Sequence, residues 1–420
     1  MKLTVAELFA GVGGFRVGLN KIKEIDINGR AVEDKVWDFV WANQFEPSTK
    51  TQHAFNCYVT RFGDSNCSNT DINKVNKDNI PDHSLLVGGF PCQDYSVARS
   101  LSSEKGIEGE KGIEGKKGVL FWDIRDIVVA KQSPFILLEN VDRLLKSPAL
   151  KKGRDFAVML KTFSELGYDV QWRVINAGQY SMPQKRKRVF IFAYKNSTKF
   201  AKKIKLEDVN LNIHNIFNVA FPVEHINNFR CIDLNEYDDI LNVSNDYADG
   251  KFLECGIMTD GKVIHSNITA IEEEKYSLSK IIKEATPFNT DLNKYIVSDE
   301  KIDRWKYLKG SKKIERISST GYPYIYSEGA MSFPENMSEP ARTMLTSEGT
   351  TNRTSHIIFD EEIKEYRILT PVECELIQMF PVNWTNTMPN KKRYFMMGNA
   401  LVTGIVSRIE PIIREIIESE

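Results

Sequence analysis

Two almost continuous apolar runs constrain the fold of this chain more than any other feature. They read HSLLVGGF at 83–90 and SPFILLENV at 133–141. A strand with one face in water alternates apolar and polar residues, whereas a strand covered on both faces is apolar almost throughout. The two runs therefore predict central strands of a sheet that has helices on both faces.

Further strands and helices are predicted around these runs. Strand-like stretches lie at 3–9, 36–42, 168–177 and 188–194, and helical spacing is found at 17–25, 48–62, 118–131 and 154–167. Alternation of strands and helices is typical of a parallel, doubly wound α/β sheet, which binds its ligands outside the carboxyl ends of the strands. We therefore expect a Rossmann-like α/β fold.

The alternation stops near residue 196, and helical periodicity returns at 368–380 and 399–417. This predicts one domain formed by 1–195 and 356–420, and a smaller domain, 196–355, inserted into it. Residues 142–205 hold sixteen Lys and Arg against four Asp and Glu, and 301–316 are basic again. A basic belt can bind a polyanion or be an ordinary solvated surface, and the net charge of −1 does not decide between them.

The spacing of the cysteines and the N-terminal residues indicate the cell compartment in which the chain works. The six cysteines form no C-x-x-C pair and have no histidine at metal-ligand spacing, which favours free thiols over disulfides or a metal site. The first residues, MKLTVAELFAG, lack the apolar core of a signal peptide. We expect a cytosolic chain with no metal and no membrane association.

A glycine turn follows the first predicted strand in FAGVGGF, where Gly11, Gly13 and Gly14 permit a sharp turn and a close approach to a ligand. Arg16 stands where the dinucleotide-binding fingerprint requires its third glycine. A purely structural turn and a nucleoside site both remain open. Gln44, Phe45 and Asp71 follow the next strands.

Cys92 and Glu139 end the two most apolar strands. Cys92 follows Phe90-Pro91 at the start of a long loop, which favours a reactive thiol over a buried structural one. The loop 93–118 contains the repeat KGIEGE-KGIEGK and reads either as a lid or as a neutral insertion. A carboxyl group at the end of FILLEN would have its pKa raised by burial and would then suit proton donation, unless it only caps a helix.

Two arginines, Arg186 and Arg188, lie two residues apart in MPQKRKRVF. Alternate residues of a strand share a face, so both guanidinium groups are expected on one face. Such a pair suits an anion or the carbonyl group of a base.

Together these motifs resemble the DNA cytosine-5 methyltransferases. The ordered pieces are FAGVGGF, GGFPCQDYS, LLENV, GQYSMPQKRKRVFI, RILTPVECELIQMFP and MGNALV, over about 1–194 and 360–410. The segment 196–355 falls where that family carries its target-recognition domain. The pieces PARTMLTSEGTTNRTSH and NQFEPSTKTQHAF resemble bacterial restriction–modification members, in particular those specific for GATC.

The resemblance implies an enzyme that transfers a methyl group from S-adenosylmethionine to C5 of a flipped-out cytosine in double-stranded DNA and releases S-adenosylhomocysteine. It implies that Cys92 attacks C6, that Glu139 acts at N3, that Arg188 holds the base carbonyl and that Arg186 positions Cys92 or a phosphate. It assigns cofactor binding to Phe9, Gly11, Gly13, Gly14, Gln44, Phe45, Asp71, Leu120 and Asn399. It also implies a monomer, with a cognate restriction endonuclease acting on the same site without stable contact.

The chain departs from the family pattern at Gln44, where the ribose-binding residue is usually an acid, at Phe45, where tryptophan is frequent, and in its longer loop after Cys92. Three alternatives stay open. A tRNA cytosine-5 methyltransferase would keep the chemistry, an inactive DNA-binding homologue would keep only the substrate, and a nicotinamide-dependent oxidoreductase would use the glycine turn differently.

Overall fold

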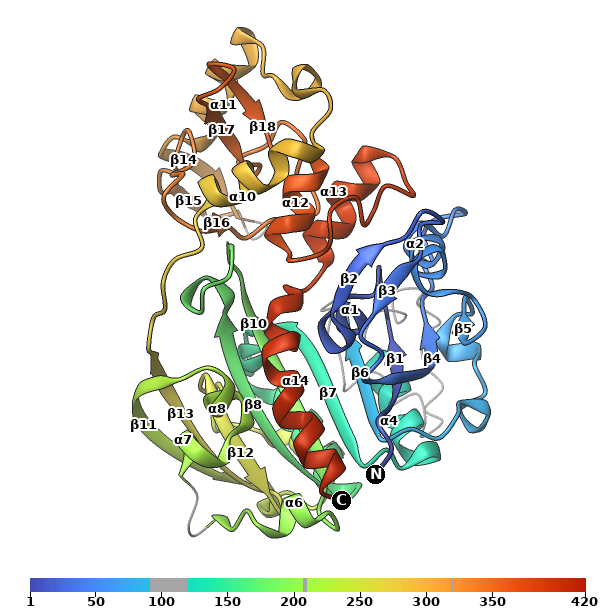
Figure 1. Cartoon of the computed structure of the whole chain (residues 1–420). Helices are drawn as coiled ribbons and strands as arrows, with labels where there is room; N and C mark the ends of the chain where they lie inside the picture. The colour runs from blue at the N-terminus through green and yellow to red at the C-terminus, as the bar shows by residue number, and fades with distance from the viewer. Residues whose placement is uncertain (91–119, 207–209, 319–320) are drawn as a thin grey trace.

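A computed structural model describes residues 1–90, 120–206, 210–318 and 321–420. Cys92 and the loop 93–118 lie outside these residues. The chain forms two lobes, a lower one around a large sheet and an upper one of short helices and ribbons (Figure 1). Both termini lie at the foot of the lower lobe.

The lower lobe is built on one ten-stranded sheet with the order β11-β13-β12-β8-β10-β7-β6-β1-β4-β5. The strands, in that order, are β11 (Val223–Asp233), β13 (Lys262–Ala270), β12 (Cys255–Thr259), β8 (Tyr168–Asn176), β10 (Lys187–Lys195), β7 (Phe135–Val141), β6 (Leu85–Gly89), β1 (Thr4–Leu8), β4 (Asp38–Asn43) and β5 (Cys67–Ser68). The strands β7, β6, β1, β4 and β5 are parallel, and β10 is antiparallel to both β7 and β8. The sheet is thus mixed, whereas strand–helix alternation predicted a parallel one. The reason is that β8 and β10 are joined by a short connection, which forces them to run antiparallel.

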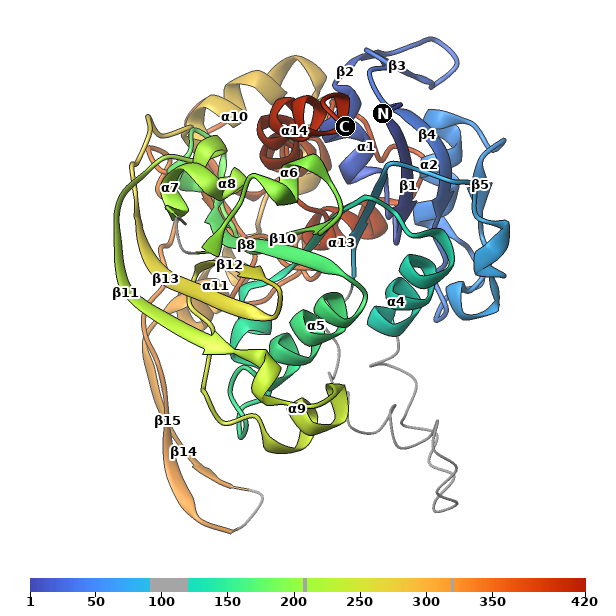
Figure 2. The same ribbon diagram turned by 90° about the horizontal axis from the view of Figure 1, so that it is seen from below.

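Two apolar cores flank this sheet, as the uninterrupted runs predicted. On one face Leu86, Ile136 and Leu138 pack with α4 (Leu120–Lys131), α5 (Arg154–Glu165) and α9 (Ile240–Asp246). On the other face Leu85 and Val87 pack with helices that include α1 (Gly14–Asn20), α8 (Ile216–Ala220) and α14 (Thr403–Glu418). Neighbouring residues of β6 thus point to opposite faces, and both faces are covered (Figure 2). The Rossmann-like α/β fold is confirmed.

The helix predicted at 17–25 is wrong in its second half. The helix α1 ends at Asn20, and Ile22–Ile25 is β2, which pairs with β3 (Ala31–Glu33). The turn between them contains Asn28-Gly29, with Gly29 at φ +80°. An Asn-Gly pair is a strong hairpin signal that outweighs a short run of helical spacing.

The upper lobe holds most of the remaining elements. They are α10 (Leu278–Ala285), α11 (Asp299–Lys309), β14 (Lys312–Ile317), β15 (Pro323–Glu328), β16 (Ala341–Arg342), β17 (Ile357–Asp360), β18 (Glu365–Ile368), α12 (Pro371–Ile377) and α13 (Asn390–Asn399). The remaining short helices are α2 (His53–Phe62) beside β4, α6 (Lys199–Lys202) and α7 (Leu211–His214). Residues 223–270 extend the main sheet, so the segment 196–355 spans two structurally different parts. The target-recognition role of that segment stays a prediction.

Candidate active site

A pair of oppositely charged side chains stands at the carboxyl edge of the sheet. Because β10 runs antiparallel to β7, its first residues lie beside the end of β7, with Arg188 paired to Val141 and Phe190 to Glu139. The Arg188 Nε atom lies 3.0 Å from Oε1 of Glu139, and both side chains are mostly buried. The sequence placed these residues 49 positions apart, and the direction of the strand brings them into contact.

The environment of Glu139 raises the pKa of its carboxyl group above the ordinary value for a glutamate in water. Burial raises the pKa of the Glu139 carboxyl group, while the charges of Arg188 and then Arg186 lower it without cancelling the rise. Gly89 is the β6 neighbour of Glu139, and a Cβ atom there would lie 3.3 Å from Oε2 of Glu139. The carboxyl group therefore has a proton affinity suited to hydrogen bonding or proton transfer at this edge.

Arg186 does not share the partner of Arg188. It is almost completely buried, and its Nη1 and Nη2 atoms donate to the carbonyl oxygens of Met344, at 3.0 Å, and Gly398, at 3.1 Å. Burial, followed by repulsion from Arg188, lowers the pKa of Arg186, although a guanidinium group stays charged near neutral pH. Arg186 therefore ties the start of β10 to the upper lobe and to the end of α13.

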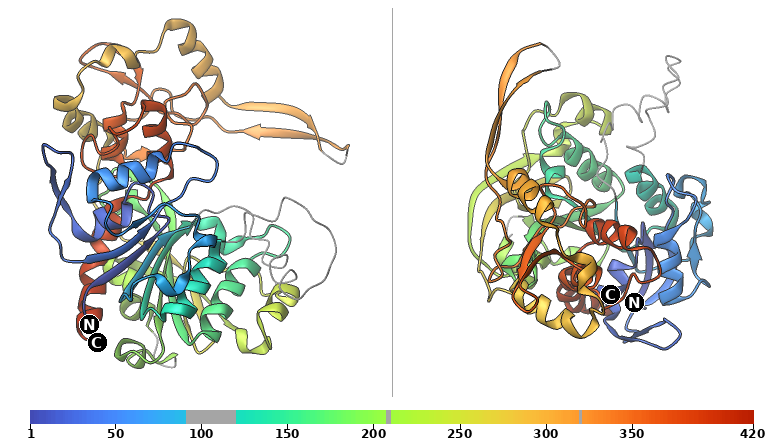
Figure 3. Two further views of the ribbon diagram at one scale, coloured as in Figure 1. Left: turned by 90° about the vertical axis from the view of Figure 1, so that its right-hand side faces the viewer. Right: turned by 90° about the horizontal axis from the view of Figure 1, so that it is seen from above.

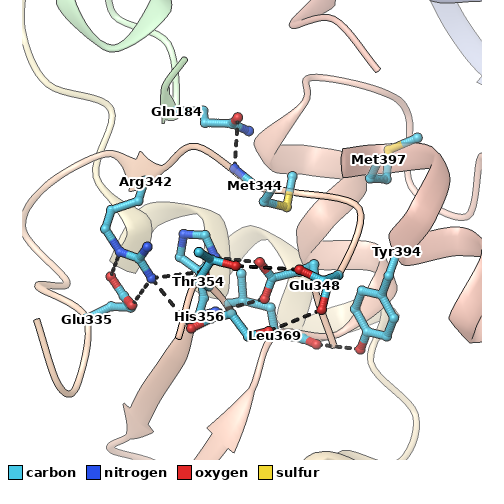
Figure 4. Close-up of polar contacts among 12 residues, drawn as sticks. Gln184, Glu335, Arg342, Met344, Glu348, Thr354, His356, Leu369, Tyr394 and Met397 are labelled. Carbon is cyan, nitrogen blue, oxygen red and sulfur yellow. Dashed lines mark hydrogen bonds and ion pairs between the residues drawn. The ribbon is translucent and has the colours of Figure 1, made fainter. Parts of the chain in front are cut away.

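The segment that receives Arg186 is itself held by a polar network (Figure 4). Oε1 of Gln184 accepts from the backbone N–H of Met344 at 3.3 Å, and Arg342 pairs with Glu335. Further along, Nδ1 of His356 lies 2.8 Å from Oε2 of Glu348, with both side chains buried. These contacts hold the segment to which Arg186 donates.

The glycine turn lies at the end of β1 and has the shape of a ligand cradle. Phe9 has φ +52° and Gly11 φ +57°, so the backbone turns back on itself directly after β1. Among the described residues, a Cβ atom on Gly11 would meet only the carbonyl oxygen of Phe9, at 3.9 Å, so these residues leave space above the turn. Gly13, at φ +90°, is different, because a Cβ atom there would come within 2.5 Å of the ring of Phe62.

Gln44 connects the end of β4 to this turn. Its Oε1 accepts from the backbone N–H of Gly11 at 2.7 Å. Asn69 donates to the Gln44 carbonyl oxygen at 2.6 Å, which holds the segment leading to Asp71 beside Gln44 and Phe45. The carboxylate of Asp71 accepts from the backbone N–H of Asn73 at 3.2 Å as a helix cap.

Leu120 and Asn399 approach the site from other elements. Leu120 is the first residue of α4 and packs against the same core as Phe90. Asn399, the last residue of α13, is exposed and adjoins Leu401, whose side chain lies against Gly14. The sequence-predicted cofactor residues thus fall at the carboxyl ends of β1, β4 and β5 and on two segments beside them.

Two positioning residues were not singled out from the sequence. Nδ2 of Asn140 donates to the carbonyl oxygen of Phe90 at 3.0 Å and so fixes the chain two residues before Cys92. Gln184 holds Met344 through its Oε1 atom, which accepts from the backbone N–H of Met344. Both lie inside the quoted motifs LLENV and MPQKRKRVF, but no local pattern indicates that an amide reaches across to another strand or lobe.

The described cysteines other than Cys231 have thiols that disfavour the reactive anion. Burial raises the pKa of Cys57, Cys67 and Cys255 to about 11. Burial also raises the pKa of Cys374 well above its ordinary value. Within the described ranges, we find neither a group of three metal-binding side chains nor a helix long and apolar enough to cross a membrane.

The fold is that of a Rossmann-like methyltransferase. The C-5 cytosine-specific DNA methylase family matches residues 3–418, so the chain belongs to this family of S-adenosylmethionine-dependent DNA cytosine methyltransferases. It is 46% identical over 413 residues to the type II methyltransferase M.Sau3AI of Staphylococcus aureus, covering 97% of this chain and 94% of the relative. It is 32% identical over 194 residues to the type II methyltransferase M.HhaI of Haemophilus parahaemolyticus, covering 46% of this chain and 50% of the relative.

Two solved structures share the fold at low sequence identity. The S. pombe Dnmt2 methyltransferase matches with a TM-score of 0.58 and 15% identity, covering 98% of both chains. The Entamoeba histolytica methyltransferase EhMeth matches with a TM-score of 0.56 and 16% identity, covering 100% of this chain and 98% of the other. The family match and the 46% identity with M.Sau3AI make the chain a type II DNA cytosine methyltransferase of the restriction–modification kind.

Proposed function

We propose that this enzyme methylates C5 of a cytosine rotated out of duplex DNA, through a covalent bond between Cys92 and C6 of the base. The ion pair of Glu139 with Arg188 at the carboxyl edge carries the proposal. A base must leave the helical stack before its ring can be reached, and the edge beside Gly89 offers a carboxyl group and a guanidinium group to its polar atoms.

The residues at the glycine turn fit S-adenosylmethionine. Its methionine part would lie over Gly11, where a Cβ atom has open space, and its ribose beside Gln44. Phe45 would cover the adenine ring and Asp71 would accept from its amino group, with Phe9, Leu120 and Asn399 completing the pocket and Gly13 and Gly14 shaping the turn. When bound, the cofactor supplies an electrophilic methyl group.

The remaining chemistry belongs to the chain's own side chains. The Cys92 thiolate bonds to C6 while Glu139 gives its proton to N3, so the electron pair of the C5–C6 double bond becomes available at C5. After C5 is methylated, its proton is lost to solvent and the N3 proton returns to Glu139, so that the C5–C6 double bond is restored and Cys92 leaves C6 as a thiolate. Arg188 holds the base carbonyl oxygen and keeps Glu139 oriented. Arg186 acts as a positioning residue, because its donors go to Met344 and Gly398.

We further propose GATC as the recognition sequence, with 196–355 as the target-recognition domain and a cognate restriction endonuclease for the same site. The resemblance of 340–356 and 43–55 to GATC-specific members supports this sequence. A monomer is expected, because one chain holds every proposed site residue. A sedimentation measurement at micromolar concentration checks the oligomeric state.

One experiment tests the function directly. Purified protein is mixed with tritiated S-adenosylmethionine and either duplex DNA containing GATC or total tRNA, and modified cytosines are mapped by bisulfite sequencing. The proposal predicts label in the DNA at the cytosine of GATC and none after Cys92→Ala. Label in the tRNA would overturn the substrate, and modified cytosines in unrelated contexts would overturn GATC.

A further inference from the structure

A two-stranded ribbon stands away from the upper lobe. It consists of β14 (Lys312–Ile317) and β15 (Pro323–Glu328), which form a sheet of their own. Strands of this length span about 20 Å. The left view of Figure 3 shows the ribbon projecting from the upper lobe, and Figure 2 places it on the same side of the molecule as α5 and α9.

The base of the ribbon is fixed by polar contacts. Arg353 donates to the carbonyl oxygens of Leu308, at 2.7 Å, and Gly310, at 3.1 Å, and its Nη1 lies 3.2 Å from Oε2 of Glu328. Lys312 donates to the Leu308 carbonyl oxygen at 2.9 Å. Because both strands are held at this end, the ribbon has a defined direction relative to the upper lobe.

The outer part of the ribbon exposes large apolar side chains on both faces. Opposite residues of an antiparallel pair share a face, so Arg316 and Tyr324 lie on one face and Glu315 and Ile325 on the other. The exposed fraction is 75% for Ile317, 66% for Ile325 and 46% for Tyr324. A two-stranded ribbon is marginally stable when its faces are uncovered, and grouped exposed apolar residues mark interaction surfaces.

We propose that the ribbon β14–β15 enters the major groove of duplex DNA beside the target cytosine. This inference rests on the proposed function. The major groove is wide enough for a two-stranded β-ribbon, and its thymine methyl groups accept apolar contacts. The ribbon therefore acts as a second DNA contact, separate from the pocket that takes the flipped base.

The charges of the ribbon support a nucleic acid over another protein. Beyond its base the ribbon carries Lys313 and Arg316 against a single acid, Glu315. The Arg316 guanidinium carbon lies 3.9 Å from the centre of the Tyr326 ring, so the cation is stacked and held at the surface. Lys313 lies on the same face as Ile317 and Ile325, and Arg316 lies on the opposite face, so one cation would reach phosphates from each face of the ribbon.

The test compares ribbon variants with a matched control. Ile317→Ser/Ile325→Ser removes the apolar side chains, and Arg316→Ala removes one cation. The control, Ile27→Ser/Ile213→Ser, removes two exposed isoleucines outside the ribbon. Affinity is measured by fluorescence anisotropy on a duplex of about three helical turns, at several salt concentrations, with cofactor affinity as the readout of correct folding.

We expect the ribbon isoleucine pair to weaken DNA binding about tenfold, with kcat at saturating DNA unchanged and the control like wild type. Arg316→Ala should lower the slope of log affinity against log salt by about one. A second variant guards against substitutions that disturb the strands. It replaces 313–327 by a short Gly-Asn-Gly turn, and it should show the same loss of DNA affinity.

Other outcomes separate the two proposals. Ribbon variants that bind and methylate DNA like wild type would overturn the groove contact while leaving the function intact. So would variants that change only self-association in sedimentation, since a second copy would then be the partner. A wild-type protein that methylates no DNA would overturn the proposed function and this inference with it.

Discussion

The Arg188 guanidinium lies 3.0 Å from the Glu139 carboxylate, and this contact joins two neighbouring strands of the sheet, β10 and β7. It exists because β10 runs against β7, so that the first residues of one strand meet the last residues of the other. Arg188 stabilises the buried Glu139 carboxylate, but the pKa of Glu139 stays raised, so the carboxyl group can still bind a proton.

Glu139→Gln should slow methyl transfer by about 10²-fold or more, because the amide has no acidic proton to give to the base. Single-turnover transfer of tritium to duplex DNA measures the rate, and titration calorimetry measures cofactor binding, which should be unchanged. A rate near that of wild type would mean that Glu139 serves only to orient Arg188.

The two arginines should respond differently to replacement by lysine. Arg186→Lys should lower the free energy of unfolding by about 2–3 kcal/mol, since one ammonium group cannot satisfy the carbonyl oxygens of both Met344 and Gly398. Arg188→Lys should change stability by less than about 1 kcal/mol and act mainly on kcat. Urea unfolding and steady-state kinetics of both variants check this, and equal losses of stability would contradict it.

Gln44→Glu should tighten cofactor binding about tenfold. The amide oxygen already accepts from the N–H of Gly11 at 2.7 Å, and a carboxylate would keep that bond and accept more strongly from a ribose hydroxyl. Calorimetry with S-adenosylmethionine provides the measurement, and Gln44→Met, which removes the acceptor, is the opposite control. Unchanged affinity in the glutamate variant would argue against a ribose partner at this position.

Alanine at the two turn glycines distinguishes cofactor space from chain packing. Gly11→Ala adds a methyl group into open space, so it should cost only about 1 kcal/mol of stability, from the left-handed backbone, but weaken cofactor binding strongly. Gly13→Ala meets Phe62 and should cost about 2–3 kcal/mol. If Gly11→Ala binds the cofactor normally, the cofactor does not lie over this turn.

Glu7 should make stability depend on pH. Burial raises its pKa from 4.5 to about 7, against a hydrogen bond from Tyr58 and the charge of Arg16. The folded state therefore holds this proton more tightly than the unfolded state, so the free energy of unfolding falls as the pH rises from 4.5 to about 7. The loss amounts to at most about 3 kcal/mol.

Urea unfolding between pH 4.5 and 8 tests the role of Glu7. Glu7→Gln should flatten the fall, whereas Glu24→Gln, at an exposed strand position, should keep it. A Glu7→Gln variant with the slope of wild type would place the pH dependence elsewhere.

The sequence predicted the buried strands well because burial on both faces leaves a pattern along the chain itself. A polar residue at the end of an apolar strand interrupts that pattern, and Glu139, Arg188 and Gln44 were singled out from the sequence in this way. Their partners could not be predicted. The contact of Arg188 with Glu139 depends on strand direction, and the bond of Gln44 to Gly11 depends on which strands are neighbours.

The inserted segment was the hardest part to predict. Strands β11 to β13 lie in a region rich in Asn and Asp, and they join the main sheet through the pairing of β12 with β8 rather than through a pattern of their own. Long-range pairing of this kind leaves little trace in local composition. The hydrogen bonds from Arg186 to Met344 and Gly398 could not be predicted from the sequence either, because their acceptors are backbone carbonyl groups, which every residue has.

The measurement that tests the central claim most directly uses a GATC duplex with 5-fluorocytosine at the target position. Fluorine cannot leave C5 as a proton does, so the bond between Cys92 and C6 would persist after methyl transfer. We predict a denaturation-resistant protein–DNA complex that maps to the peptide containing Cys92 and is absent in Cys92→Ala. Methylation of ordinary duplex DNA by the wild-type enzyme, with no such complex on the fluorinated duplex, would contradict covalent catalysis by Cys92.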